Sequence, residues 1–471
     1  MKVNLVCSPK NSIKETLYLI DKNGYGTCFI QDDLKGLVGV ITDGDLRRAI
    51  LQGKDLEEPV KNILSKKFVF AKERENLLDI RKKLSDEIKI IPIVNVKNKV
   101  VDFIANNKIN AIPVASPDLY GNELKYLTDA FLSTWISSSG EYINKFEKKF
   151  SSYVNCKYGS LVSNGTVALE LALKSFGVQP GQEVILPDFT FAATINSVLN
   201  IGATPVLVDI EEDSWCISPE KIKKHINRKT AAIIVVHVYG QPANMEKIMK
   251  ISNHFNIPII EDCAEAHGAK FKNKPVGSFG AIGTYSFYAN KIITTGEGGI
   301  CVTNSKTLFK KMAKIKNHGM SENKRYWHEI QGSNYRMTNM QAAIGLAQFE
   351  RVELMLKIRK KYENTYKKIF RDKGLKISFQ KNLKDRKRVV WLACGTMENS
   401  FSREKLFKKL VNKGIDTRKV FYSLSDMPIF KKYSPEECKV SKDISSRGIS
   451  FPTFNNELRL DNIKQSLVKN F

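Results

Sequence analysis

Between residues 160 and 304, short runs rich in valine and isoleucine alternate with stretches whose apolar residues recur at helical spacing. The runs are EVILP, TPVLVDI, AAIIVVHVYG, IPIIEDC, IGTYSFY and GGICVTN, and the helical stretches include TFAATINSVLNIG, SPEKIKKHI and NMEKIMKISNHF. Strands without polar alternation are buried on both faces, and helices between them indicate a mostly parallel sheet. We therefore predict an α/β fold that binds its ligands at the carboxyl ends of these strands.

The length of 471 residues predicts two or three units with separate cores. Turn-forming residues in ANNKINAIPVASPDLYGN mark a boundary near residue 115, and a long charged helix begins near residue 350. We expect an N-terminal module at 1–114, a large domain at 115–355 and a small C-terminal α/β subdomain at 356–471.

Composition narrows the functional classes. No apolar run approaches the roughly 18 to 20 residues that a membrane span needs, and MKVNLVCSPKNSIKETL holds no sustained apolar segment. We expect a cytoplasmic protein without a membrane partner. The eight cysteines form no CxxC pair and the six histidines no HExxH motif, so reduced thiols and no metal are expected.

The net charge of +26 raises the question of a nucleic-acid partner. The excess is concentrated in residues 351–471, which hold 30 lysines and arginines against 13 acidic residues. These cations are spread through amphipathic stretches and form no long basic block. We interpret them as a solvated surface and expect no nucleic-acid partner.

The first 110 residues contain an internal repeat, in which a helix-like run precedes two short strands around a polar turn. A pair of such units resembles a tandem CBS module, a small α/β domain that often binds adenosine nucleotides. In the first copy, GVITDGD matches that family's ribose-binding pattern and offers Thr42 and Asp45 as a nucleotide site. The second copy has DFIANNK at this place. A structural module without ligand remains an equal alternative.

A phosphate site is indicated by SLVSNGTVALELALKSFG. Ser163 and Asn164 are good N-caps for an apolar helix from Val167 to Phe176, and Gly165 permits close approach of a ligand to the backbone. Many helices begin in this way and bind nothing. The chain contains no GxxxxGK[ST] loop and no GxGxxG after a strand, which argues against a nucleoside triphosphatase or a dinucleotide enzyme.

Three further residues give that helix a more specific interpretation. Asp262 ends an apolar strand, where a carboxylate is costly unless it meets a cation or several donors, although a helix N-cap is an alternative role. Ser286 and Lys291 follow in SFYANK, and a desolvated lysine can act as an amine nucleophile. A helix terminus, a strand-end aspartate and a lysine are the groups that bind the phosphate, ring nitrogen and aldehyde of pyridoxal phosphate.

The order of these elements resembles the fold type I pyridoxal phosphate enzymes, because the lysine lies 29 residues beyond the aspartate. Five blocks narrow the resemblance to the nucleotide-sugar aminotransferases of the DegT/StrS group. They are SNGTVAL, LPDFTFAAT, EDCAEAHGA, GSFGAIGTYSFYANKIITTGEGG and GSNYRMTNMQAAIGLAQFE. The resemblance extends from about residue 112 to 457 and implies a large domain with a mostly parallel sheet followed by a small α/β subdomain.

The resemblance implies a catalytic role for Lys291, which would bond to the cofactor aldehyde, while Asp262 pairs with the pyridine nitrogen. Gly165, Thr166 and Ser286 would hold the phosphate.

Three further cofactor contacts are implied in the same way. Phe191 would stack on the ring, and Glu265 would lie near the ring hydroxyl, where many relatives have glutamine. Asn334 would reach the cofactor phosphate of a neighbouring subunit, which implies a homodimer with shared active sites.

The implied reaction is a transamination in which glutamate is the amino donor and a nucleotide-linked 4-keto-6-deoxy sugar is the acceptor. The blocks KRYWHEIQGSNYRMTNMQAAIGLAQFE and SFYANKIITTGEGG are most similar to those of GDP-perosamine synthases, which aminate GDP-4-keto-6-deoxymannose. Two blocks depart from the pattern of those enzymes, namely HVYGQPANM and FYSLSDMPIF. An aminotransferase that acts on a UDP-linked keto sugar is therefore the alternative. A regulatory nucleotide-binding protein with a silent aminotransferase domain is a further alternative, which an intact Lys291 disfavours.

Overall fold

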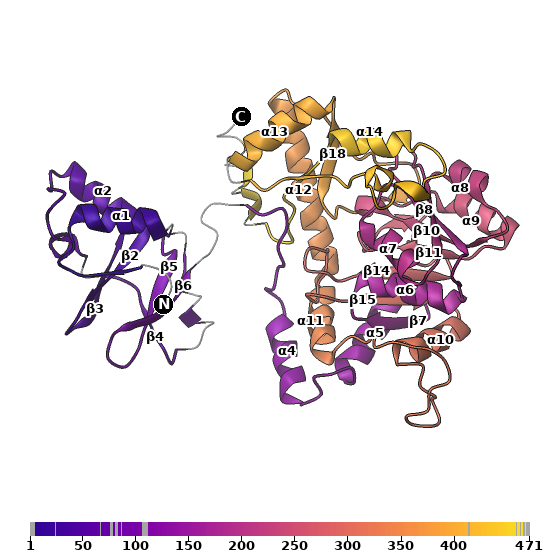
Figure 1. Cartoon of the computed structure of the whole chain (residues 1–471), viewed down its shortest axis with the longest axis horizontal. Coiled ribbons are helices and arrows are strands. Elements are labelled where there is room, and N and C mark those ends of the chain that lie inside the picture. The colour runs from indigo at the N-terminus through magenta and orange to yellow at the C-terminus, as the bar shows by residue number, and fades with distance from the viewer. Residues whose placement is uncertain are drawn as a thin grey trace. The chain divides into compact units, whose positions relative to one another are not determined.

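The computed structural model describes residues 5–467 apart from 24, 66, 76–78, 81–82, 86, 106–111, 413–414, 458, 462 and 465–466 (Figure 1). Contacts divide the chain into two compact units, Met1–Asn110 and Ala111–Phe471. The further division of the second unit at residue 355 stays a prediction.

The first unit holds two three-stranded sheets of the same plan. In each, the first strand pairs in parallel with the second, and the second pairs in antiparallel with the third. This shared plan is the predicted internal repeat. Its elements are β1 (Val6–Cys7), α1 (Ile13–Asn23), β2 (Thr27–Asp32), β3 (Gly36–Thr42), α2 (Asp43–Leu51), the 3-10 helix η1 (Val60–Ile63), β4 (Ala71–Lys72), β5 (Ile90–Val94) and β6 (Val100–Ala105).

A seven-stranded sheet forms the centre of the second unit, in the order β7-β15-β14-β11-β10-β8-β9. All its strands run in the same direction except β15, which pairs in antiparallel with both neighbours. The mostly parallel sheet is therefore confirmed. The strands are β7 (Tyr158–Val162), β8 (Glu183–Pro187), β9 (Thr204–Val208), β10 (Thr230–Val236), β11 (Ile259–Asp262), β14 (Ile282–Ser286) and β15 (Gly299–Thr303).

Helices surround this sheet, and Figure 1 shows them in magenta and orange around the strands. The predicted apolar helix begins after Asn164, whose side chain accepts a hydrogen bond from the Val167 N–H, and ends at Gly177 with φ of 80°. The helices of this part are α4 (Glu123–Leu132), α5 (Glu141–Tyr153), α6 (Gly165–Phe176), α7 (Ala192–Asn200), α8 (Pro219–His225), α9 (Met245–Phe255), α10 (Lys306–Lys316), α11 (Asn339–Glu350) and the 3-10 helix η2 (Val238–Gly240). Two short strands, β12 (Lys270–Phe271) and β13 (Lys274–Pro275), lie outside the seven-stranded sheet.

The C-terminal part of this unit builds a four-stranded sheet, in the order β16-β18-β20-β19. A hydrophobic cluster of its own lies between this sheet and the long helix α12. The elements are α12 (Val352–Asp372), β16 (Ile377–Phe379), β17 (Arg386–Lys387), β18 (Ala393–Met397), α13 (Ser400–Asn412), β19 (Arg418–Lys419), η3 (Leu424–Asp426), η4 (Lys431–Tyr433), α14 (Lys439–Arg447) and β20 (Gly448–Phe451).

Two predictions from composition can be compared with the described residues. All eight cysteines are buried, and none of them forms a disulfide in the structure. Among the helices of the described part, none is long and apolar enough to cross a bilayer.

Candidate active site

The carboxyl ends of two neighbouring parallel strands bring the predicted residues together. Asp262 is the last residue of β11 and Ser286 the last of β14, and these strands pair with Asp262 opposite Thr284. Lys291 follows in the loop between β14 and β15. Because parallel strands end at the same edge of a sheet, the three side chains share one edge.

Lys291 is almost enclosed, with 11% of its side chain exposed. Its Nζ atom lies 3.7 Å from Glu265 Oε1 and 4.1 Å from the centroid of the Trp391 ring. Burial lowers the pKa of Lys291 below its ordinary value, although the nearby carboxylates oppose the shift. The lowered pKa favours the neutral amine, which is the nucleophilic form.

Asp262 is buried and accepts two hydrogen bonds, from Thr194 Oγ1 at 3.0 Å and from the Ala264 N–H at 3.1 Å. No ion pair to Asp262 occurs among the described residues. Burial raises the pKa of Asp262, against the effect of the two hydrogen bonds. A buried carboxylate at a strand end that lacks a direct ion pair is suited to receive a cation from a ligand.

Glu265 lies three residues beyond Asp262 and is also buried. Its Oε2 atom accepts a 2.7 Å hydrogen bond from the N–H of Tyr239, a residue held at φ of 51°. Burial raises the pKa of Glu265 to about 7, although Lys291 lowers it. This carboxyl can therefore hold or release a proton near neutral pH.

The amino terminus of α6 meets the end of β14. A methyl group at Gly165 would approach Cβ of Ser286 to 2.7 Å, so only glycine permits this closeness. The first N–H groups of a helix, here those of Gly165 and Thr166, have no partner within the helix. The Ser286 hydroxyl beside them completes a set of donors suited to a phosphate.

Two of the predicted residues lie at the surface of the chain. Phe191 precedes α7 and is 60% exposed, and its ring centroid lies 6.0 Å from that of Phe421. Asn334 is exposed, and its Oδ1 accepts a 2.9 Å hydrogen bond from Arg336 Nε. Within the described part of the chain, no recorded hydrogen bond joins Asn334 to Lys291.

The structure adds residues that sequence reasoning missed. The ring of Trp391 lies beside the Lys291 amine. It is stacked on the rings of Tyr239 and Phe421, with distances of 5.5 Å and 6.1 Å between ring centroids. Thr194 donates to Asp262. No local signal marks Trp391, because the run VVWLAC has the pattern of an ordinary core strand. Thr194 lies one helical turn after Phe191, so it could have been predicted to face the same site as that residue.

In the first unit, Thr42 and Asp45 lie together at the start of α2 and bond to each other. Thr42 Oγ1 donates to Asp45 Oδ2 at 2.7 Å, and the Asp45 N–H donates back to Thr42 Oγ1 at 3.2 Å. Although burial opposes it, the bonds from Thr42 and Arg48 lower the pKa of Asp45. In the second copy, residues 106–108 of DFIANNK lie outside the described residues.

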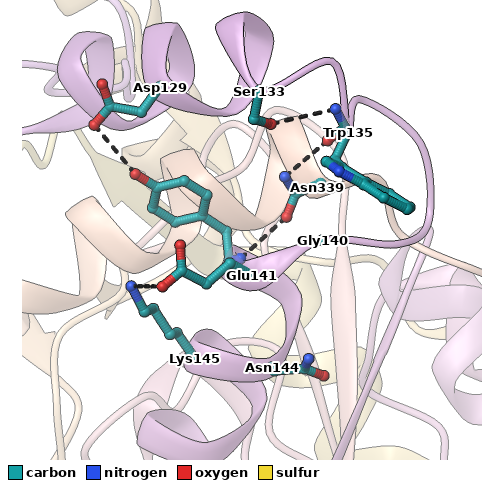
Figure 2. A pocket seen from close by; sticks show the side chains of 9 residues that line it. Asp129, Ser133, Trp135, Gly140, Glu141, Asn144, Lys145 and Asn339 are labelled. Carbon is teal, nitrogen blue, oxygen red and sulfur yellow. Dashed lines mark hydrogen bonds and ion pairs between the residues drawn. The ribbon is translucent and has the colours of Figure 1, made fainter.

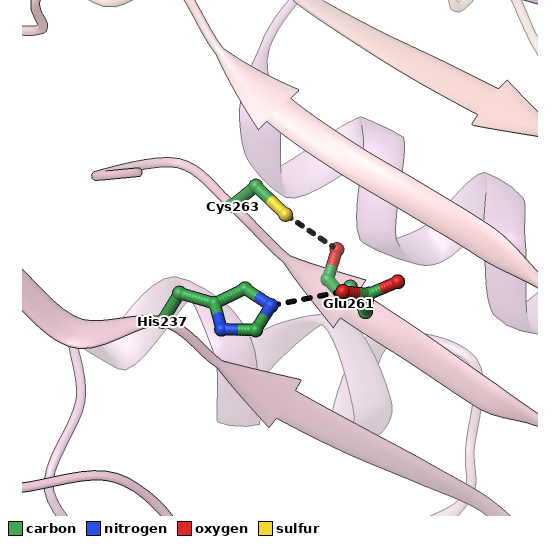
Figure 3. Close-up of side chains that lie close together, drawn as sticks. All are labelled: His237, Glu261 and Cys263. Carbon is green, nitrogen blue, oxygen red and sulfur yellow. Dashed lines mark hydrogen bonds and ion pairs between the residues drawn. The ribbon is translucent and has the colours of Figure 1, made fainter. Parts of the chain in front are cut away.

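His237, Glu261 and Cys263 form the one buried group of metal-ligating side chains that the described residues contain (Figure 3). His237 Nδ1 accepts from the Ala243 N–H at 3.0 Å, so its Nε2 carries the proton that it donates to Glu261 Oε2, also at 3.0 Å. Glu261 further accepts three N–H groups of the loop 277–280. These hydrogen bonds use the lone pairs that a metal would need, so the group is a structural network.

A cavity of about 700 Å³ lies between α4 and α5, away from the residues above (Figure 2). Asn339 closes one side, because it donates to the Trp135 carbonyl at 2.8 Å and accepts from the Tyr142 N–H at 3.1 Å. Glu141 and Lys145 form an ion pair at its rim. None of the predicted cofactor residues lines it.

Comparison with known proteins identifies the family. The model of the DegT/DnrJ/EryC1/StrS aminotransferase family matches residues 117–467, and the CBS domain model matches residues 1–52. The chain belongs to the DegT/DnrJ/EryC1/StrS aminotransferase family. The match to the CBS model covers the first copy of the repeat, which is the copy that carries Thr42 and Asp45.

Relatives and solved structures agree with this membership. The aminotransferase is 43% identical over 344 residues to the GDP-perosamine synthase of Escherichia coli O157:H7, covering 73% of this chain and 93% of that protein. It is 40% identical over 346 residues to the GDP-perosamine synthase of Vibrio cholerae, covering 73% and 94%. The crystal structure of 3-amino-5-hydroxybenzoic acid synthase matches with a TM-score of 0.69 and 27% identity, over 77% of this chain and 99% of that one. The predicted fold type I architecture with an N-terminal CBS module is therefore confirmed.

Proposed function

We propose that this chain is a cytoplasmic pyridoxal phosphate-dependent aminotransferase that converts GDP-4-keto-6-deoxymannose to GDP-perosamine for a surface polysaccharide, with glutamate as amino donor. The observation that carries the proposal is the meeting of Asp262, Ser286 and Lys291 at one edge of the sheet, beside the amino terminus of α6. The substrate rests on relatives at 40 to 43% identity, which are GDP-perosamine synthases.

The residues present fit this cofactor. Asp262 is a buried carboxylate without a cation and would pair with the ring nitrogen, while Gly165, Thr166 and Ser286 would hold the phosphate. The enclosed amine of Lys291 would bind the aldehyde.

Phe191, Glu265 and Asn334 complete the proposed contacts. The exposed ring of Phe191 would cover one face of the cofactor ring, and Glu265 would lie near the ring hydroxyl. Asn334 would contribute to the site of a second subunit.

Pyridoxal phosphate, when bound, supplies a ring that accepts electrons from the substrate carbon and carries the amino group between two substrates. The Asp262 carboxylate would hold a proton on the ring nitrogen, because that ion pair would relieve the cost of burying the carboxylate. Lys291 Nζ, with its pKa lowered by burial, would accept the proton from the donor's Cα and pass it to the cofactor carbon that takes up the amino group. When the acceptor sugar is aminated, the same amine would move a proton in the opposite direction, from the cofactor to the sugar carbon. Glu265 can donate or accept a proton beside this amine near neutral pH.

Reduction of the purified protein with borohydride tests the cofactor role. The pyridoxyl group should appear on the peptide that contains Lys291, and Lys291→Ala should remain unlabelled. Lys316, which is partly buried and bonds to the Leu161 carbonyl, is a suitable control residue for substitution. A label on another lysine would exclude the assignment.

The acceptor is tested by parallel reactions with glutamate and either GDP- or UDP-linked 4-keto-6-deoxy sugars. Mass spectrometry should show the amino sugar from the GDP substrate. Amination of the UDP substrate alone would instead support the alternative that the departures in HVYGQPANM and FYSLSDMPIF left open. No amination of either, with labelled Lys291, would contradict the proposed substrate class.

A homodimer is the proposed active unit. The segment 119–136 exposes an unusual number of large apolar side chains for the surface of a monomer. They are Leu119, Tyr120, Leu124, Phe131, Leu132, Trp135 and Ile136. The exposure of these side chains, together with the exposed position of Asn334, supports a second copy that would cover them and share the active sites.

Mixed dimers test the sharing directly. Lys291→Ala and Asn334→Ala should each be inactive or impaired alone. If Asn334 acts across the interface, a mixed dimer has one site with both residues intact, and random mixing should restore about a quarter of the wild-type activity. A mixture no more active than its components would show that Asn334 does not act in a partner's site.

For the CBS module we propose a nucleotide site at Thr42 and Asp45. Titration calorimetry with adenosine and guanosine nucleotides should give heat with the wild type and none with Asp45→Ala. Asp43→Ala is the matched control, because Asp43 lies in the same turn of α2 and pairs with Arg47. No binding to the wild type would favour the module without ligand.

A further inference from the structure

Three successive peptide carbonyls around Lys291 are held by side chains from the C-terminal part of the chain. Trp391 Nε1 donates to the Asn290 carbonyl at 2.9 Å, and Asn455 Nδ2 donates to the Ile292 carbonyl at 2.9 Å. Between them, Arg359 on α12 reaches the Lys291 carbonyl with its NH2 group at 3.5 Å. The backbone on both sides of Lys291 is thus held by hydrogen bonds from residues 359, 391 and 455, which lie outside the loop that contains the lysine.

Arg359 also joins the other two donors. Its Nε atom donates to Asn455 Oδ1 at 2.5 Å, and its NH1 group donates to the carbonyl of Trp391. Every acceptor around this guanidinium is therefore a neutral oxygen. The three side chains form one connected network, in which Arg359 orients both Asn455 and the tryptophan segment.

The charge of Arg359 makes this network unusual. The residue is 1% exposed, and no ion pair to it occurs among the described residues. Burial lowers its pKa to about 9. Burying an arginine without a partner carboxylate costs free energy of folding. We therefore infer that Arg359 has a role other than stabilising the fold.

Arg388 offers a direct comparison within the same part of the chain. It is also buried, with 2% of its side chain exposed, but it bonds to the carboxylate of Glu363, whose side chain is 1% exposed. Arg388 therefore has the usual form of a buried structural ion pair. It contacts none of the carbonyls that surround Lys291.

We propose that Arg359 is a positioning residue, which acts with Asn455 and Trp391 to hold the backbone of residues 290–292 so that Lys291 Nζ stays between Glu265 and the Trp391 ring. The carbonyls of Asn290, Lys291 and Ile292 lie in the loop from 287 to 298 that connects β14 to β15, so no strand pairing holds them. The meaning of this inference rests on the proposed function of Lys291. Positioning matters because a displacement of about 1 Å at a reacting group can cost about 100-fold in rate.

The test follows the amine of Lys291 in cofactor-free protein. Reductive methylation across a pH series, read by mass spectrometry of the Lys291 peptide, reports the pH midpoint of its reactivity. Arg359→Ala should move this midpoint upward, toward that of an ordinary lysine, because a loosened amine regains water and approaches the carboxylates of Asp262 and Glu265. In the holoenzyme, kcat should fall about 10- to 100-fold with little change in KM.

Two variants separate the parts of the network. Trp391→Phe keeps an aromatic ring and removes only the donor to the Asn290 carbonyl, and Asn455→Ala removes the donor to the Ile292 carbonyl. Both should shift the midpoint in the same direction as Arg359→Ala, by less. If Arg359→Ala fails to fold, these two variants decide the question. Added guanidinium ion should restore the wild-type midpoint in folded Arg359→Ala.

Arg388→Ala is the matched control and should lower the melting temperature without moving the Lys291 midpoint. A wild-type midpoint in all three network variants would overturn the proposal, as would an equal shift in Arg388→Ala. The labelling needs no substrate. A shifted midpoint in a protein that aminates no sugar would therefore leave the positioning role standing and reject only the proposed function.

Discussion

At the scale of residues, the site gathers three titratable groups whose burial moves each toward its neutral form. The pKa of Lys291 is lowered, and those of Asp262 and Glu265 are raised, with burial as the largest cause in all three. Such opposed shifts are typical of sites prepared for proton transfer. Glu265 is the group whose pKa, about 7, lies nearest to physiological pH.

Glu265→Gln should change how stability depends on pH. The unfolded glutamate has a pKa of about 4.5 and the buried one about 7, so the folded chain holds the extra proton between these values. The free energy of unfolding of the wild type therefore falls as pH rises through this window, by up to about 3 kcal/mol from this group. The glutamine variant should lack that decrease.

Urea unfolding of cofactor-free protein measures this slope. Tryptophan fluorescence is suited to it, because all four tryptophans lie in the second unit. Glu246→Gln, at an exposed position on α9, should keep the wild-type slope. Equal slopes in the wild type and Glu265→Gln would contradict the assigned pKa shift.

At the scale of elements, the site depends on how closely α6 approaches β14. The helix begins at Gly165 and the strand ends at Ser286, and a Cβ atom at Gly165 would come within 2.7 Å of the serine Cβ. The phosphate site is therefore made by two elements that are far apart in sequence. Its geometry should be sensitive to a single methyl group at their contact.

Gly165→Ala should lower the affinity for pyridoxal phosphate by about 10- to 100-fold, because overpacking of about 1 to 3 kcal/mol pushes Ser286 away from the helix terminus. Equilibrium dialysis or fluorescence titration measures the change. The double variant Gly165→Ala, Ser286→Gly should regain stability but not affinity, since the hydroxyl is lost. Wild-type affinity in Gly165→Ala would show that the phosphate binds elsewhere.

At the scale of the whole molecule, the chain joins an aminotransferase unit, matched by the family model at residues 117–467, to an N-terminal module matched by the CBS model at residues 1–52. The matched 73% of this chain already covers 93% of the Escherichia coli GDP-perosamine synthase. The contacts within Met1–Asn110 and within Ala111–Phe471 define two separate compact units. Catalysis and the proposed nucleotide site therefore belong to different units.

Removal of residues 1–111 should leave an active aminotransferase. The remaining unit keeps its seven-stranded sheet and its own hydrophobic clusters, so its melting transition should stay within about 2 °C of the same transition in the full chain. Transamination should stay within about twofold. Calorimetric melting and the sugar assay measure both, and aggregation or loss of activity would show that catalysis needs the module.

Much of this architecture was predictable from local patterns. The valine and isoleucine runs predicted the strands β8, β9, β10, β11, β14 and β15, and Asn164 and Gly177 predicted the two ends of α6. Asp262, Ser286 and Lys291 could be proposed because strand ends in a parallel sheet share an edge. The internal repeat likewise follows from spacing alone.

The sequence by itself therefore determined the fold class, the family and the candidate cofactor residues, since these depend on periodicity and on short contiguous motifs. Only the tertiary structure decided the surroundings of Lys291. Trp391, Arg359 and Asn455 approach it from positions 68 to 164 residues further along the chain, as their contacts with residues 290–292 show. Burial and hydrogen bonding between such distant segments arise from packing of the whole unit, and no local pattern encodes them.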